Sequence, residues 1–133
     1  MIEHAIRLIR GQDLHQELSN YCLKNNINTA IVLSGVGCVL KLRMRLAKAI
    51  EVMEVEEDYE IVSLTGTISN GAVHVHIALS DDKGQTIGGH LMPGTIINTT
   101  CELVLGQLET YQSSRVFDEA TGYDEIIFDK EAQ

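Results

Sequence analysis

The dipeptide Asn70-Gly71 lies between two stretches that alternate polar and apolar residues, 59–69 and 72–80. Both residues tolerate the positive φ angles of a two-residue type I′ turn, and this pattern is the strongest short-range signal for a β-hairpin. In such a hairpin Ser69 lies opposite Ala72, and this first pair determines every later pair along the two strands. The sequence therefore predicts both the hairpin and its register.

That register divides the hairpin into a polar face and an apolar face. On the polar face it pairs His74 with Thr67, His76 with Thr65, and Ala78 with Ser63. On the apolar face it pairs Val73 with Ile68, Ile77 with Leu64, and Leu79 with Val62. A strand with one apolar face is half-buried, so the face that carries the two histidines is expected to point away from the core.

The remaining segments predict one helix and several more strands. Asp13 is a typical N-cap for a helix in which Leu14, Leu18 and Cys22 recur at helical spacing, with Asn25-Asn26 as its end. Strands are expected at 3–10, 29–33, 40–46, 86–90, 96–105 and 125–128, with a break at 34–37 and a turn or edge strand at 51–58. One helix and about seven strands indicate an α+β fold with a mainly antiparallel sheet, in a single domain covering residues 1–133.

Composition restricts the environment and the partners. The chain is 44% hydrophobic and 22% charged, it contains no apolar stretch near the roughly 20 residues of a membrane helix, and Met1-Ile2-Glu3-His4 begins no signal peptide. We therefore expect a cytoplasmic protein without a membrane partner. The three cysteines, Cys22, Cys38 and Cys101, are widely spaced and form no C-x-x-C pair, so we interpret them as buried thiols. A formal charge of −9 disfavours DNA as a partner.

Three histidines form the main candidate site. His74 and His76 lie on one side of a strand, about 7 Å apart along it, and two imidazoles at that spacing can share a metal ion. His90 follows after a tight turn, and Gly88-Gly89 before it allows the backbone to approach closely. Three histidines with an open fourth position are typical of catalytic or exchangeable zinc sites, with Thr65 and Thr67 as candidate hydrogen-bonding partners of the ligands. The alternative is that they are ordinary polar residues on a sheet face.

Other candidate residues carry weaker signals. Gly35-Val36-Gly37 lacks the third glycine and the following helix of a dinucleotide loop, so we interpret it as a bend between strands. Lys41, Arg43 and Arg45 share one strand face and are candidates for contacting an anion, or are simply solvated. Glu60 and Glu102 are candidate acid/base residues near the histidines.

Several motifs in this order resemble the PPC (plant and prokaryote conserved) domain. They are Glu60-Ile61-Val62-Ser63-Leu64-Thr65-Gly66, His74-Val75-His76, Asp82-Lys83-Gly84 and Gly88-Gly89-His90, and the resemblance covers nearly the whole chain. It implies an α+β fold, a homotrimer of the stand-alone prokaryotic type, and a metal ion held by His74, His76 and His90. In plants the domain follows AT-hook motifs, and this sequence has no Arg-Gly-Arg-Pro hook.

From these observations the leading hypothesis is a homotrimeric metal-binding module for zinc or another divalent ion, acting in binding or assembly. One alternative is a metal-dependent enzyme that acts on a small molecule, with Glu60 or Glu102 as the proton carrier. A second alternative is a DNA-associated regulator in which the trimer presents Lys41, Arg43 and Arg45. Two strands carry rows of apolar residues, and together these rows are larger than one helix can cover. This surplus of apolar surface also favours self-association.

Overall fold

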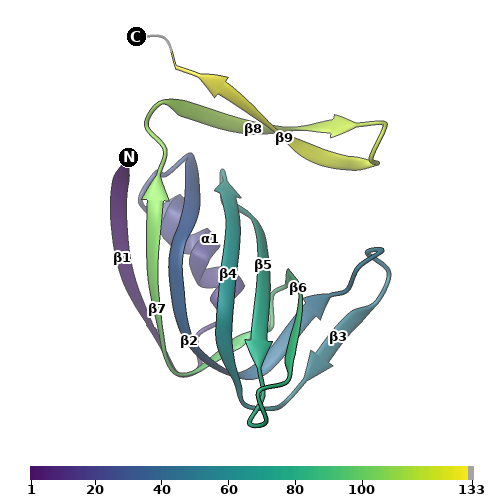
Figure 1. Cartoon of the computed structure of the whole chain (residues 1–133). Coiled ribbons are helices and arrows are strands. Elements are labelled where there is room, and N and C mark those ends of the chain that lie inside the picture. The colour runs from purple at the N-terminus through teal and green to yellow at the C-terminus, as the bar shows by residue number, and fades with distance from the viewer. Residues whose placement is uncertain (132–133) are drawn as a thin grey trace.

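The computed structural model describes residues 1–131, and these form one helix and nine strands. Along the chain the elements are β1 (Ile2–Ile9), α1 (Leu14–Lys24), β2 (Thr29–Arg45), β3 (Val52–Val55), β4 (Tyr59–Ser69), β5 (Ala72–Ser80), β6 (Thr86–Leu91), β7 (Ile96–Gln107), β8 (Tyr111–Asp118) and β9 (Tyr123–Lys130). Seven strands form the main antiparallel sheet, and β8 and β9 form a separate two-stranded ribbon (Figure 1). The predicted α+β fold is confirmed.

The main sheet has the strand order β1-β7-β2-β4-β5-β6, and β3 extends it by pairing with β2. Helix α1 packs on one face of this sheet, as Figure 1 shows. Asp13 is the N-cap, and its side chain accepts a hydrogen bond from the Gln16 backbone N–H, as the sequence predicts. The core lies between this helix and the sheet, and Leu14, Leu18 and Cys22 of the helix are fully buried in it.

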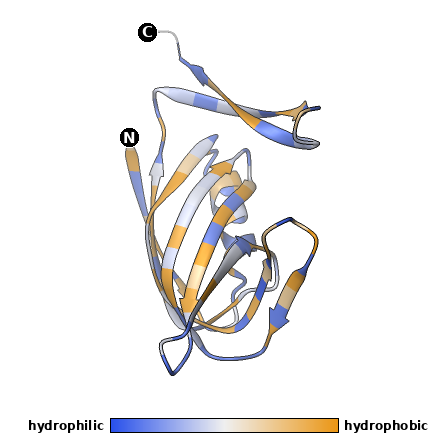
Figure 2. Ribbon diagram, turned by 45° about the vertical axis from the view of Figure 1, so that its right-hand side comes forward, coloured by the Kyte–Doolittle hydropathy of each residue, from blue (hydrophilic) through white to orange (hydrophobic). Residues whose placement is uncertain are grey.

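The β4–β5 hairpin has the predicted register over most of its length. Ser69 pairs with Ala72 around the Asn70-Gly71 turn, and both turn residues have positive φ, 49° and 81°. Hydrophobic and hydrophilic residues alternate along the strands of the sheet (Figure 2). The predicted contact between Leu79 and Val62 is wrong, because a bulge between Ile61 and Ser63 shifts the register and gives Leu79 the partner Ile61.

Strand β2 differs most from the prediction. The expected break at 34–37 is absent, and one strand of 17 residues runs from Thr29 to Arg45. Register shifts in its pairing with β7 bend the strand without ending it. A Cβ atom at Gly37 would lie 2.2 Å from the Thr100 carbonyl oxygen, so this glycine permits close backbone approach to β7 instead of forming a turn.

The β8–β9 ribbon is anchored at one residue. The Ser113 hydroxyl lies 2.6 Å from both the Thr29 and the Ser69 hydroxyl oxygens, and the Ser113 backbone N–H donates to the Asn28 side chain at 2.7 Å. Asn70 donates to the Ser113 carbonyl at 3.1 Å. This buried polar cluster joins the start of β8 to the start of β2 and the end of β4, and so determines where the ribbon leaves the sheet.

Cys22 and Cys101 are buried free thiols, as predicted, whereas Cys38 is only half-buried. The Cys38 thiol donates to the Asn98 carbonyl at 3.1 Å. Within residues 1–131 no helix is long and apolar enough to cross a membrane.

Candidate metal centre

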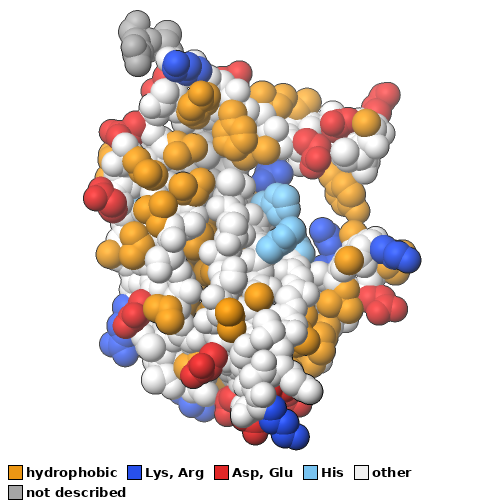
Figure 3. All heavy atoms as spheres, in the orientation of Figure 1, with side chains coloured by type: hydrophobic (Ala, Val, Ile, Leu, Met, Phe, Trp, Pro, Cys, Tyr) orange, Lys and Arg blue, Asp and Glu red, His pale blue; other side chains and the backbone are white. Residues whose placement is uncertain are grey.

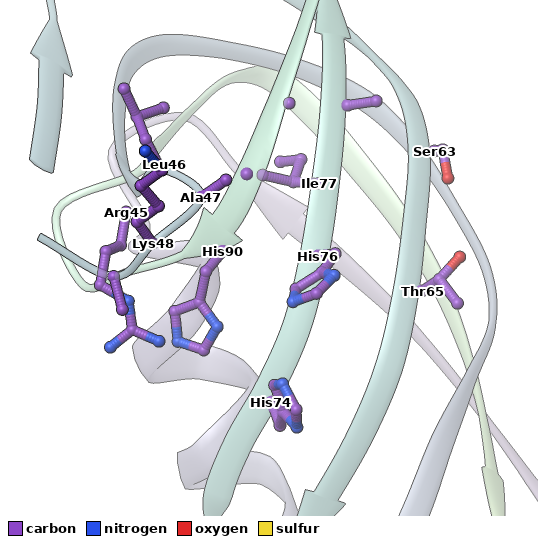
Figure 4. Close-up of a pocket in the computed structure, with 14 residues that line it drawn as sticks. Arg45, Leu46, Ala47, Lys48, Ser63, Thr65, His74, His76, Ile77 and His90 are labelled. Carbon is purple, nitrogen blue, oxygen red and sulfur yellow. The ribbon is translucent and has the colours of Figure 1, made fainter. Parts of the chain in front are cut away.

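His74, His76 and His90 come together at the β5–β6 edge of the sheet. His74 and His76 lie two residues apart on β5, so both point to the same face. His90 on β6 is the direct backbone partner of His76, which brings it to that face as well. The potential ligand nitrogens of the three side chains all lie within 4.8 Å of one another. All three come from the same chain (Figure 4).

The rings face one another without stacking. Their centroids are 5.4 Å apart for His74 and His76, 5.5 Å for His74 and His90, and 5.8 Å for His76 and His90. The Nδ1 atom of His90 is buried, and among the described residues it has no hydrogen-bond partner. A buried polar atom without a partner calls for a bound ion or water.

This donor set fits a divalent metal ion. Imidazole nitrogen suits zinc, and a tetrahedral site with Zn–N bonds of about 2.0–2.1 Å places its ligand atoms about 3.3 Å apart. Ligand atoms within 4.8 Å of one another reach that spacing by small side-chain rotations. His74 and His76 are exposed, and the buried His90 Nδ1 has no other partner among the described residues, so the three side chains fit the role of metal ligands.

A cavity of about 540 Å³ opens in front of the histidines, which lies within the size range of small-molecule sites. Besides the histidines, its polar and charged lining consists of Arg45, Lys48, Ser63 and Thr65. The histidines lie beside a visible hollow in the surface, with cationic side chains next to them (Figure 3). An ion at the histidines would therefore have room for a further ligand.

Partial burial and nearby positive charge lower the pKa of two of these histidines, His74 and His90, and favour their neutral form. Burial is the largest cause that lowers the pKa of His90, to about 4, and the charge of Arg45 is the next. The pKa of His74 is lowered by burial, by His76 and by Arg115. A metal ion binds the neutral form of imidazole, so at neutral pH both residues are ready to bind one.

The predicted basic row Lys41, Arg43 and Arg45 divides into two parts. Lys41 Nζ lies 2.9 Å and Arg43 Nε 3.8 Å from the carboxylate of Glu54 on β3. Arg45 is instead the backbone partner of His90, and its guanidinium lies beside the His90 ring (Figure 4). Of the three candidate anion contacts, the structure brings only Arg45 to the histidines.

Arg115 is a site residue that the sequence analysis missed. It lies on β8 and lines a second cavity of about 370 Å³, which shares Arg45, His74 and His90 with the first. Strand β8 was not predicted, and only the ribbon's attachment at Ser113 brings residue 115 to the histidines. No local sequence signal indicates that contact.

The candidate acid/base and hydrogen-bonding residues lie as follows. Glu60 lines a different cavity, together with Asp58, Asp81 and Asp82. Glu102 is exposed on β7, three strands away from β5 in the sheet order. Thr65 and Thr67 pair with His76 and His74 as predicted, but within residues 1–131 neither side chain donates a hydrogen bond to a histidine. The cavity at the histidines is lined by no carboxylate from the described part of the chain.

Comparison with known proteins identifies the family of this chain. Residues 1–109 match the Plants and Prokaryotes Conserved (PCC) domain, which is the family that the sequence motifs resemble. A hypothetical protein from Salmonella cholerae-suis has a similar solved structure, with 31% identity, a TM-score of 0.94 and coverage of 98% of this chain and 95% of the other. The metal-containing protein AF0104 from Archaeoglobus fulgidus is similar at 27% identity and a TM-score of 0.82, over 96% of this chain and 94% of the other.

A curated relative is much longer than this chain. The bifunctional protein GlmU of Synechococcus sp. (strain JA-3-3Ab) is 41% identical over 130 residues, which is 98% of this chain and 21% of that protein. The chain thus spans about a fifth of the length of the curated relatives it matches. The match of residues 1–109, together with the fold and the motifs, shows that the chain belongs to the Plants and Prokaryotes Conserved domain family.

Proposed function

We propose that this chain binds one divalent metal ion through His74, His76 and His90, with zinc as the preferred ion, and acts as a homotrimeric binding or assembly module. The observation that carries the proposal is the convergence of three imidazoles from two adjacent strands, with ligand atoms within 4.8 Å of one another. The Archaeoglobus relative, of almost the same length and fold, is described as metal-containing, which supports a metal role for this chain.

The choice of zinc rests on the donors. Three neutral imidazoles without a thiolate or carboxylate are typical of zinc sites that retain an open position. When bound, such an ion supplies a Lewis acid that can hold and polarise a further ligand. The residues of this chain position the ion, since β5 and β6 hold the rings on one face and the cavity leaves space beside them.

The uncovered sheet face supports self-association. Leu33, Val36 and Val62 lie on strands β2 and β4 and are 46%, 53% and 59% exposed, while helix α1 covers the opposite face. Exposed apolar groups on one face of a sheet are typical of interfaces. Light scattering should give three times the chain mass, and a monomer at micromolar concentration would contradict the homotrimer.

The metal site is tested by elemental analysis of the purified, untagged protein beside a His74→Ala/His76→Ala double variant. We expect about one zinc per chain in the parent and none in the variant, because one remaining imidazole cannot hold the ion. His4→Gln is the matched control, since His4 lies away from the cluster and hydrogen-bonds Tyr21 and Gln107. A parent that stays metal-free after incubation with zinc would overturn the proposal.

A metal-dependent enzyme is the second candidate, favoured by the cavity of about 540 Å³ in front of the histidines. Neither Glu60 nor Glu102 lines this cavity, so a proton carrier in it would have to be another group. A small-molecule hydrolysis screen on the zinc-loaded protein tests this role, with His76→Ala as the inactive control.

A DNA-associated role finds little support on the described surface. The single carboxylate of Glu54 offsets one of the two positive charges of Lys41 and Arg43, and the formal charge of the whole chain is −9. Absence of duplex DNA binding at low salt would remove this role, because phosphate contacts are strongest there.

A further inference from the structure

The cavity at the histidines is positively charged in a negatively charged protein. The chain carries 19 Asp and Glu residues, yet the charged residues that line the cavity with all three histidines are Arg45 and Lys48. The adjoining cavity adds Arg115 on one side and Asp124 and Glu125 on the other. Three neutral imidazoles leave the charge of a bound divalent ion uncompensated. Positive charge therefore accumulates at this one place, against the sign of the whole molecule.

Arg45 is held beside the histidines by backbone pairing. It is the register partner of His90 across β2 and β6, and within residues 1–131 it forms no ion pair with a carboxylate. Lys41 and Arg43 on the same strand face both approach Glu54. The guanidinium of Arg45 thus keeps its five N–H donors available for a ligand.

Arg115 supplies a second guanidinium from the ribbon. One of its terminal nitrogens, Nη1, donates to the Asp124 backbone carbonyl at 3.1 Å. Its Nε is buried and finds no hydrogen-bond partner in the described part of the chain. The Arg115 side chain also lines the adjoining cavity, where an anionic ligand would meet its guanidinium group.

The nearby acidic residues lie outside the positively charged cavity that contains all three histidines. Asp124 and Glu125 line the outer cavity on the ribbon side, and neither lines the cavity that contains all three histidines. Glu125 acts on His74 with the opposite sign to Arg115 and Arg45. The charged residues that line the cavity with all three imidazoles, Arg45 and Lys48, are both positive.

We propose that the ligand of this centre is a small molecule with a carboxylate or phosphate group, held between the bound metal ion and the guanidinium groups of Arg45 and Arg115. The inference rests on the proposed metal site. The planar fork of an arginine matches the two oxygens of such a group and forms paired hydrogen bonds with them. Because the anion offsets repulsion between the ion and the arginines, each ligand should strengthen the binding of the other.

The test uses the full chain loaded with Co²⁺, whose visible absorption reports on the ligands of the ion. Inorganic phosphate and, separately, acetate are titrated in, with chloride as the reference anion. We expect a saturable spectral change with phosphate, acetate or both, and the stronger of the two identifies the preferred group. An Arg45→Met/Arg115→Met variant should retain one Co²⁺ per chain and bind that anion at least about tenfold more weakly.

Two controls separate this inference from the metal site itself. Lys83→Met removes one positive charge from an exposed turn remote from the cavity, and it should leave the anion affinity unchanged. Metal content is measured first, and a parent without Co²⁺ overturns the metal site and the anion site together. A loaded parent that ignores both anions, or an arginine variant with unchanged anion affinity, overturns the anion site alone.

Discussion

His76 on β5 and His90 on β6 are direct backbone partners in the antiparallel pairing of the two strands. Residues directly opposite each other in such a pair have Cβ atoms about 4.5–5.5 Å apart on one face. His74 reaches the same face from two residues earlier on β5. The cluster is therefore a property of one local hairpin, and it should form whenever β5 and β6 pair.

The first prediction concerns the protonation of His90. Burial and the charge of Arg45 lower its pKa to about 4, so in the metal-free protein the ring should stay neutral as the pH falls from 7 to about 5. NMR titration of the imidazole signals measures this directly. Arg45→Met removes the second cause and should raise the pKa of His90. A ring that titrates near 6.5 in the parent would contradict the prediction.

The lowered pKa of His90 should also make the metal-free fold less stable in acid. The unfolded chain takes up a proton at His90 near pH 6.5, whereas the folded chain resists it until about pH 4, so the free energy of unfolding falls across this interval. His90→Gln lacks this group and should lose less stability on acidification. Urea unfolding of both metal-free proteins at pH 7 and pH 4.5 checks the difference, and equal losses would argue against it.

The cysteines should differ sharply in reactivity. Burial raises the pKa of Cys22 to about 11 and is the largest cause that raises that of Cys101, to about 12. The thiolate is the reactive form, so both should be inert in the folded protein, while the half-buried Cys38 is accessible. A thiol reagent should therefore label one cysteine per native chain and three after unfolding. Cys38→Ser should abolish native labelling, and rapid labelling of all three would contradict this assignment.

Local patterns were sufficient to predict the hairpin register and the helix start. The turn Asn70-Gly71 set the pairing of His74 and His76 with Thr67 and Thr65, and the Asp13 cap set the start of the helix. Each of these depends on residues near one another in the chain. That is why the three histidines could be predicted from the sequence to lie close together on one sheet face.

Long-range contacts were beyond such reasoning. Gly37 looked like part of a bend, yet the structure uses it for close approach to Thr100, far away in sequence. The ribbon carries Arg115 to the histidines through hydrogen bonds of Ser113 with Thr29 and Ser69. Neither relationship produces a periodic pattern in the sequence, because both depend on which strands become neighbours.

The ribbon anchor is the basis of a fourth prediction. Ser113→Ala adds no bulk but removes the hydroxyl shared with Thr29 and Ser69. The buried Ser69 hydroxyl then loses its partner, while Thr29 keeps its hydrogen bond to Asn28. A buried polar group that loses its partner costs about 1–3 kcal/mol. Amide hydrogen exchange should accelerate in β8 and β9 while the main sheet stays protected. Ser114→Ala, at an exposed neighbouring position, should change neither.

The last prediction concerns the backbone behind the histidines. A Cβ atom at Gly66 would lie 2.1 Å from the His74 carbonyl oxygen and 2.6 Å from the Val75 Cα atom, closer than real Cβ contacts. Gly66→Ala must therefore push β5 away from β4 at His74, which should destabilise the fold by about 1–3 kcal/mol, the usual cost of overpacking. Because the shift moves one ligand relative to His90, metal affinity should fall as well.

Gly84→Ala separates this steric effect from the general cost of replacing a glycine. Gly84 lies in an exposed turn with a φ of 76°, and an added Cβ would meet nothing within 4 Å. Its replacement should cost only the left-handed backbone penalty of about 1–2 kcal/mol and leave metal affinity unchanged. Both readouts, urea unfolding and competition with a chelator, are needed. If Gly66→Ala bound the metal ion as tightly as Gly84→Ala does, the position of His74 would not depend on the close contact of β4 and β5.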